Sequence, residues 1–246
     1  MCDIIIINNT FVLEINMYWF WDSTYILVAL GALICAIASF KVSSTYKKFS
    51  NFSNGRGMTA EAVAKQILND AGIFDVRIER INGSLTDHYS PKEKVLRLSD
   101  SVWGSTSVAA IGVAAHECGH AIQHNVGYSP LKLRSASVPL ANFGSIIYWP
   151  LIIFGLILGY TGLAQAGILF FLFVVLFQLI TLPVEFNASR RAITILSESG
   201  ILFDEELIGA KKVLKSAAMT YVAALFSSIL QLLRLVLIAN RGNRRR

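Results

Sequence analysis

Long apolar runs divide this chain into parts of membrane length and parts that face water. The first run covers residues 23–40 and is preceded by aromatic residues. Residues 135–184 then form 50 consecutive positions without Asp, Glu, Lys or Arg. Since about 20 apolar residues cross a bilayer, the first run predicts one membrane helix. Residues 138–184 predict two more, joined as an antiparallel hairpin at Thr161–Gly162. A last run, residues 217–239, predicts a further membrane helix.

Two charged segments between these runs show the patterns of shorter elements. The first predicts a helix at 60–71, strands at 74–81, 86–89 and 95–98 with a hairpin turn at Asn82–Gly83, and a helix at 107–125. The second predicts helices at 186–199 and 205–215. Alternating strands joined by an Asn-Gly turn indicate a small antiparallel sheet, which would precede the helix at 107–125.

The composition strengthens this picture. The chain is 54% hydrophobic and 15% charged, whereas soluble domains carry about 25% charged residues. We therefore expect a mainly α membrane protein with about four membrane helices and a small antiparallel sheet. The three cysteines are scattered and form no CxxC pair, which argues against a disulfide framework.

Lysine and arginine predict the orientation of the chain. None precedes the first apolar run, 12 lie in residues 41–134, and five lie in residues 185–216. Because these residues favour the cytoplasmic side, we expect residues 1–22 outside the cytoplasm and both charged segments inside it. A simple fourth span would place the basic tail, residues 240–246, outside. The last helix therefore either lies along or re-enters the membrane, or departs from the rule.

The strongest chemical signal is the sequence HECGH, which begins at His116. On a helix, His116 and His120 project from the same face about one turn apart, so their imidazoles can hold one tetrahedral zinc ion. Glu117 can then reach a water on the open side of the metal and act as a general base. The motif lies on a predicted helix and among small residues, and both features make a chance HxxxH the weaker interpretation.

A catalytic zinc site needs a third protein ligand and an open position. The metzincin arrangement is excluded, because Gln123 and Val126 stand where its glycine and third histidine would be. A site-2-type intramembrane protease would use an Asp from a later membrane helix, but the only later one, Asp204, lies in a polar stretch. Glu185 is the first charged residue after the apolar hairpin, which returns the chain to the side it left. We expect Glu185 to be the third ligand, and a solvated interfacial carboxylate is the alternative.

These residues resemble a known family. HECGH, the two-helix hairpin and the following PVEFNASRRA look like the neutral zinc metallopeptidases of bacterial membranes. The chain is similar, more distantly, to HtpX and to the prenyl-processing CAAX peptidases. The resemblance covers nearly the whole chain from about residue 17, including SSTYKK, LTDHYSP, HAIQH and TYVAALFSSILQLLR.

The resemblance implies a zincin-like helical catalytic core, a gluzincin-type site with one zinc ion per chain, and Glu185 as third ligand. It also implies a multi-pass protein of the bacterial cell membrane with its active site facing the cytoplasm. HtpX-like enzymes have an Asp four residues after this Glu that orients a ligand histidine. This chain has Ser189 there, and a hydroxyl accepts the same hydrogen bond more weakly.

Other residues near the motif have lesser claims. His88, with Tyr89, precedes the zinc helix and could stabilise an oxyanion or serve only the surface. Asn187, Arg190 and Arg191 follow Glu185; either arginine could bind a substrate carboxylate, although lipid anchoring is the simpler role.

Three further features fit packing or substrate binding better than metal binding. His124 lies a third helical turn along, too far for the same ion. Cys118 points away from the ligand face, which favours a packing role. The strand at 95–98 could be the edge that pairs with an extended peptide.

Together these features predict a membrane-bound endopeptidase that hydrolyses protein or peptide substrates, including membrane proteins. The alternative is a non-catalytic membrane scaffold with a structural zinc, although such sites are closed by four ligands and no fourth is evident. A transporter is disfavoured because the charge-free hairpin offers no polar pathway. The basic tail suits anionic headgroups, so we expect the lipid bilayer as a partner and no nucleic acid.

Overall fold

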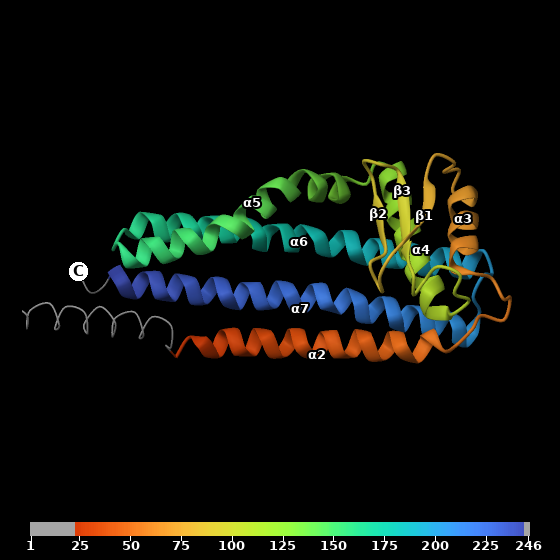
Figure 1. Cartoon of the computed structure of the whole chain (residues 1–246), viewed down its shortest axis with the longest axis horizontal. Helices are drawn as coiled ribbons and strands as arrows, with labels where there is room; N and C mark the ends of the chain where they lie inside the picture. Colours follow the sequence, from red (N-terminus) through yellow and green to blue (C-terminus); the bar gives the residue numbers. More distant parts are fainter. Residues whose placement is uncertain (1–22, 244–246) are drawn as a thin grey trace, which may run out of the picture. The chain divides into compact units, whose positions relative to one another are not determined.

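The computed structural model describes residues 23–243, with side chains to residue 240 (Figure 1). The expected extracytoplasmic segment, residues 1–22, lies outside the described residues, as does the end of the basic tail, residues 244–246. The elements are α2 (Tyr25–Ser50), α3 (Ala60–Asp70), β1 (Arg77–Ile81), β2 (His88–Ser90), β3 (Val95–Ser99), α4 (Val108–Asn125), α5 (Ser129–Ile157), α6 (Thr161–Glu198) and α7 (Asp204–Asn243).

Four helices of the described chain, α2, α5, α6 and α7, are long and apolar enough to cross a membrane. The expectation of a mainly α membrane protein with about four membrane helices is therefore confirmed. The helices are longer than the apolar runs that predicted them. The helix expected at 186–199 is the end of α6, which continues through Pro183, and the one expected at 205–215 is the start of α7. A change from apolar to polar side chains does not interrupt backbone hydrogen bonding, so it marks a change of environment rather than a helix end.

The small sheet is present, but it is mixed rather than antiparallel. The strand order is β1-β3-β2, with β1 parallel to β3 and β2 antiparallel to it. The expected hairpin between β1 and β2 is absent from the described chain. The carboxylate of Asp100 accepts the Gly83 N–H (3.0 Å), and that of Asp87 accepts the Ser99 N–H (2.7 Å). These two bonds tie the segment between β1 and β2 to the end of β3, so that β2 pairs with β3 and not with β1. Leu96 and Leu98 are fully buried, which suits β3 to the central position.

The described chain forms two compact units, to which all four long helices contribute. The larger unit, residues 36–139 and 176–223, contains the sheet, α3 and α4. Its core is built from α3, α4, β3 and the polar ends of α6 and α7, with side chains such as Ile67, Leu98, Ile111, Leu196 and Leu214. Gly119 allows α4 to approach α6 closely, because a Cβ there would lie 2.7 Å from the Ala188 carbonyl oxygen.

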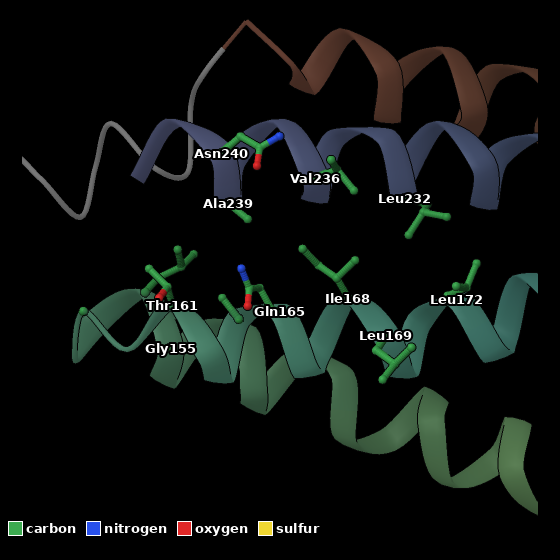
Figure 2. Close-up of a pocket in the computed structure, with 13 residues that line it drawn as sticks. Gly155, Thr161, Gln165, Ile168, Leu169, Leu172, Leu232, Val236, Ala239 and Asn240 are labelled. Atoms are coloured by element: carbon green, nitrogen blue, oxygen red, sulfur yellow. The ribbon is translucent and has the colours of Figure 1, made fainter. Parts of the chain in front are cut away.

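The smaller unit, residues 23–35, 140–175 and 224–243 of the described chain, consists of membrane-helix segments. Small residues bring the helices together, as is usual in membranes. A Cβ at Gly155 would lie 2.5 Å from the Ala164 backbone nitrogen, and one at Gly31 would lie 2.5 Å from Ser227 Oγ. An apolar cavity of about 520 Å³ lies between the start of α6 and the end of α7, with Thr161, Gln165 and Asn240 as its polar lining (Figure 2).

Candidate metal centre

Helix α4 carries HECGH through the core of the larger unit. Ser107 caps its start, because the Ser107 hydroxyl oxygen accepts the Ala110 N–H (3.2 Å). Small residues along α4, such as Ala114, Ala115 and Gly119, are fully buried or nearly so. Close packing on both sides therefore fixes the direction of the two histidines. Their ring centroids lie 4.7 Å apart, with the rings edge to face.

Glu185 reaches the same point from α6. Its Oε2 atom lies 3.2 Å from His116 Nε2 and 3.7 Å from His120 Nε2. Two ligands at about 2.05 Å from a tetrahedral zinc would be roughly 3.3 Å apart. The ligand atoms of the three residues lie within 4.8 Å of one another. The residues present therefore fit a zinc ion in both spacing and donor type.

The other ring nitrogen of each histidine is held by a neighbour. Ser189 Oγ lies 3.1 Å from His116 Nδ1, and Gln123 Oε1 lies 3.0 Å from His120 Nδ1. The Gln123 amide is oriented because its Nε2 donates to the Val184 carbonyl oxygen (2.9 Å). Its Oε1 must then face His120 and accept from Nδ1–H, which leaves the Nε2 lone pair of His120 directed at the centre. Such partners fix the tautomer that a metal needs.

A positive side chain completes the surroundings of Glu185. Arg134 Nη1 donates to Glu185 Oε1 (3.0 Å), so only Oε2 faces the histidines. The Glu185 side chain is 2% exposed. Burial lowers the pKa of His120, but donation to the Glu185 carboxylate and the nearby negative charge of Glu117 outweigh burial and raise the pKa of His120 overall. The centre therefore favours positive charge, as a cation site must.

A cavity of about 280 Å³ opens onto the centre. It is lined by both histidines, Glu117 and Glu185, by Arg134 and Tyr221, and by residues 87–89 and Pro91 around β2. Glu117 is 8% exposed and has no hydrogen bond or salt bridge within residues 23–240. Its carboxylate is thus close to the candidate metal ligands and free to accept a proton.

The remaining predicted site residues are divided between the cavity and its supports. His88 lines the cavity, but its Nδ1 meets the Thr86 carbonyl oxygen (2.9 Å) and its Nε2 meets Arg97 (3.4 Å). Neutral His88 therefore has no N–H left for an oxyanion. Asn187 does not line the cavity; its Oδ1 accepts from Gln123 Nε2 (2.9 Å) and Arg191 Nε (2.8 Å). Arg190 is exposed and also lies outside the cavity lining.

Three residues with weaker claims have packing partners. The Tyr89 hydroxyl lies 2.8 Å from His124 Nδ1, so these two residues hold β2 against the end of α4. Cys118 is fully buried, and its Sγ donates to the Ala64 carbonyl oxygen on α3 (3.6 Å). Burial raises the pKa of the Cys118 thiol, as expected for an inert packing residue.

The strand at 95–98 was wrongly expected to be an edge. It is β3, the central strand, and both of its sides are occupied by β1 and β2. β3 is buried, as suits the middle of the sheet, and the alternation of apolar and polar positions in the sequence did not reveal that burial. The edge strand beside the cavity is β2.

Sequence reasoning missed three residues at the centre: Gln123, Arg134 and Tyr221. Arg134 could have been found, because it is the last charged residue before the charge-free stretch just as Glu185 is the first after it. The two ends of the α5–α6 hairpin therefore bring opposite charges together. Gln123 lies three residues after His120 in the stretch HAIQH, but nothing in that stretch indicates a contact with His120. Tyr221 lies within an apolar run and carries no distinguishing signal.

Comparison with known proteins agrees with this geometry. Residues 24–240 match the family described as "Putative neutral zinc metallopeptidase". The chain is also 44% identical over 219 residues to "Putative membrane protease YugP" of Bacillus subtilis (strain 168). The alignment covers 89% of this chain and 97% of that protein. No solved structure matches the chain.

Proposed function

The chain belongs to the neutral zinc metallopeptidase family, and we propose that it is a membrane-bound endopeptidase with one zinc ion per chain. His116, His120 and Glu185 would hold the metal, and Glu117 would be the general base. The observation that carries this proposal is the convergence of His116 Nε2, His120 Nε2 and Glu185 Oε2 beside an unpaired carboxylate.

The donor set leaves room for catalysis. Three candidate ligands, rather than four, meet at this point in the described chain, and catalytic zinc sites keep one position open. When bound, zinc would polarise a peptide carbonyl and lower the pKa of a water molecule toward neutrality. Arg134 occupies Glu185 Oε1, so Glu185 would bind through Oε2 alone.

Glu117 would take the proton from the attacking water and deliver it to the leaving amine. Its position in the cavity wall beside both histidines supports this role. Tyr221 lines the same cavity with its hydroxyl beside the Glu185 carboxylate. We assign to this hydroxyl the stabilisation of the developing oxyanion, toward which it would turn when substrate is bound. That assignment replaces His88, whose N–H is already bonded to Thr86.

Substrates would be proteins or peptides bound in extended form. The edge strand β2 lies along the cavity through His88 and Tyr89, and its free side could pair with a peptide backbone. The positive-inside rule favours the cytoplasm for residues 41–134 and 185–216. We therefore assign the active site to the cytoplasmic face, where it would meet soluble substrates and the ends of membrane proteins.

The test is zinc content and peptide hydrolysis for the purified wild type and Glu117→Gln in detergent. We expect one zinc per chain in both proteins and hydrolysis by the wild type alone, because the amide cannot take the proton. Full activity of Glu117→Gln would contradict the general-base assignment.

The alternative, a non-catalytic scaffold with structural zinc, makes a different prediction. It requires zinc in both proteins, hydrolysis by neither, and a metal that carries no exchangeable water, because a structural zinc is closed by four protein ligands. His116→Ala and Glu185→Ala should lose zinc under either interpretation, so they test the ligands independently of catalysis.

A further inference from the structure

A second cavity, unrelated to the metal centre, lies between α2 and α7 in the larger unit. Its volume is about 480 Å³. Four lysines line it: Lys41 and Lys48 from α2, and Lys212 and Lys215 from α7. The rest of the lining consists of Phe49, Met219 and three hydroxyl-bearing residues. No carboxylate is among the lining residues.

The lysines come from two helices in close contact. The Phe49 ring of α2 packs directly on Gly209 of α7, since a Cβ at Gly209 would lie 2.7 Å from Phe49 Cδ1, and the two helices run side by side there (Figure 1). Lys41 and Lys48 are two turns apart on α2, or about 10 Å. Lys212 and Lys215 are about one turn apart on α7. The four charges therefore surround one small volume.

These charges are not compensated by the protein. None of the four ammonium groups forms a salt bridge within the described part of the chain; Lys48 Nζ lies over the Phe49 ring, 5.6 Å from its centroid. Like charges around one cavity repel, and an anion bound among them would remove that repulsion. The cavity is thus suited to a ligand with at least one negative charge.

The position along both helices specifies the kind of anion. Lys41 is the first charged residue after the apolar run 23–40, and Lys215 is the last one before the apolar run 217–239. The cavity therefore lies where both helices pass from apolar to charged sequence. Exposed apolar side chains lie next to the lysines in the direction of the apolar parts of both helices. They are Ile37, Phe40 and Met219, with exposed fractions of 58%, 76% and 41%.

We propose that this cavity binds the phosphate of an anionic glycerophospholipid. The lysines would contact the headgroup, and the acyl chains would lie along Phe40 and Met219. A free phosphate would use the lysines but not the apolar side chains. A zwitterionic lipid would bring an ammonium group into a cavity that has no carboxylate to receive it. Basic pockets between membrane helices are established sites for anionic headgroups.

The experiment uses the full chain in detergent and measures its thermal unfolding as lipid is added. The probes are phosphatidylglycerol, phosphatidylcholine and inorganic phosphate. The test variant is Lys48→Gln/Lys212→Gln. The matched control is Lys47→Gln/Lys211→Gln, which removes the same charge from neighbouring positions on the same helices but outside the cavity lining.

We expect phosphatidylglycerol to raise the unfolding temperature of the wild type and of the control, whereas the other two probes leave it unchanged. Each lysine near an anionic lipid contributes roughly fivefold in affinity. The test variant should therefore need about 25-fold more phosphatidylglycerol for the same effect.

Three results would overturn the proposal. An equal loss of response in both double variants would mean general attraction to charged lipid rather than a site. Equal protection by inorganic phosphate would make the ligand a soluble anion. An absent response to phosphatidylglycerol in the wild type would remove the site altogether. None of these results depends on peptidase activity, so the experiment tests the lipid site independently of the proposed function.

Discussion

Ser189 occupies a sensitive position, because it is the partner of His116 Nδ1 (3.1 Å). A hydroxyl accepts a histidine N–H less strongly than a carboxylate does, and such partners change metal affinity by about 10- to 100-fold. We therefore expect Ser189→Ala to weaken zinc binding by roughly 10-fold and Ser189→Asp to strengthen it. Competition with a chromogenic chelator measures both. Unchanged affinity in the two variants would mean that the orientation of His116 depends on packing alone.

Tyr221 separates substrate activation from metal binding. Its hydroxyl is assigned to the oxyanion and not to zinc, so Tyr221→Phe should retain the full zinc content. Loss of one such donor elsewhere costs about 10²–10³ in kcat, and we expect a fall of that order with little change in KM. Steady-state peptide hydrolysis by zinc-loaded protein measures the effect. A rise in KM at constant kcat would instead make Tyr221 a residue that binds the ground state of the substrate.

The candidate ligands and Ser189 could be predicted from the sequence, and the other residues that hold the ligands could not. His116 and His120 are set by helical spacing, which is local, and Glu185 follows from the return of a hairpin. The contact of Gln123 with His120 and Val184 depends on how α4 packs against α6, and no sequence spacing encodes that. Tyr221 comes from a third helix, whose rotation the sequence leaves open.

The packing of α4 on α6 brings the histidines to Glu185, and Gly119 lies at the closest point. A methyl group there would meet the Ala188 carbonyl oxygen at 2.7 Å. Because the contact involves the backbone of both helices, neither side can move away easily. Gly119→Ala should therefore destabilise the protein by about 1–3 kcal/mol and reduce zinc content by moving α4 away from Glu185. Thermal unfolding in detergent and metal analysis give the two readouts.

Gly112 provides the control for this variant on the same helix. A Cβ there would meet Ala210 Cβ at 3.5 Å, an ordinary contact, and alanine favours a helix over glycine by about 1 kcal/mol. Gly112→Ala should leave zinc content unchanged and stability equal or higher. If the two variants behave alike, the close approach at Gly119 does not position the metal ligands.

Helices were easier to predict than strand order. Each long helix follows from a long apolar run, of which the last, residues 217–239, is interrupted by Gln231 and Arg234, and the runs understate the helix lengths. The mixed order β1-β3-β2 depends on the non-local bonds of Asp87 and Asp100 with Ser99 and Gly83. The Asn82–Gly83 dipeptide alone favoured a hairpin, and these tertiary bonds outweighed it.

The path of the chain through the membrane is constrained by contacts within the smaller unit. The guanidinium of Arg234 lies over the Tyr25 ring, 3.9 Å from its centroid, so the end of α7 lies beside the start of α2. Thr161 and Asn240 line one cavity (Figure 2). The α5–α6 turn, the end of α7 and the start of α2 therefore lie at the same end of this unit. We therefore expect four spans, with Asn240 on the side opposite to the one that the positive-inside rule favours for the basic residues after it.

Cysteine labelling tests this path in cells. We expect Gly162→Cys and Asn240→Cys to react with a membrane-impermeant maleimide in intact cells, and Lys92→Cys, in the loop between β2 and β3, to react only after permeabilisation. The background would carry serine at Cys2 and Cys35 and keep Cys118, whose thiol is buried. Residue 162 tolerates the change because no atom lies within 4 Å of a Cβ there. Labelling of Gly162→Cys but not Asn240→Cys in intact cells would mean that α7 turns back before crossing, as the positive-inside rule favours for a helix followed by arginines. Labelling of Lys92→Cys in intact cells would place the metal centre outside the cytoplasm and remove cytoplasmic proteins from its substrates.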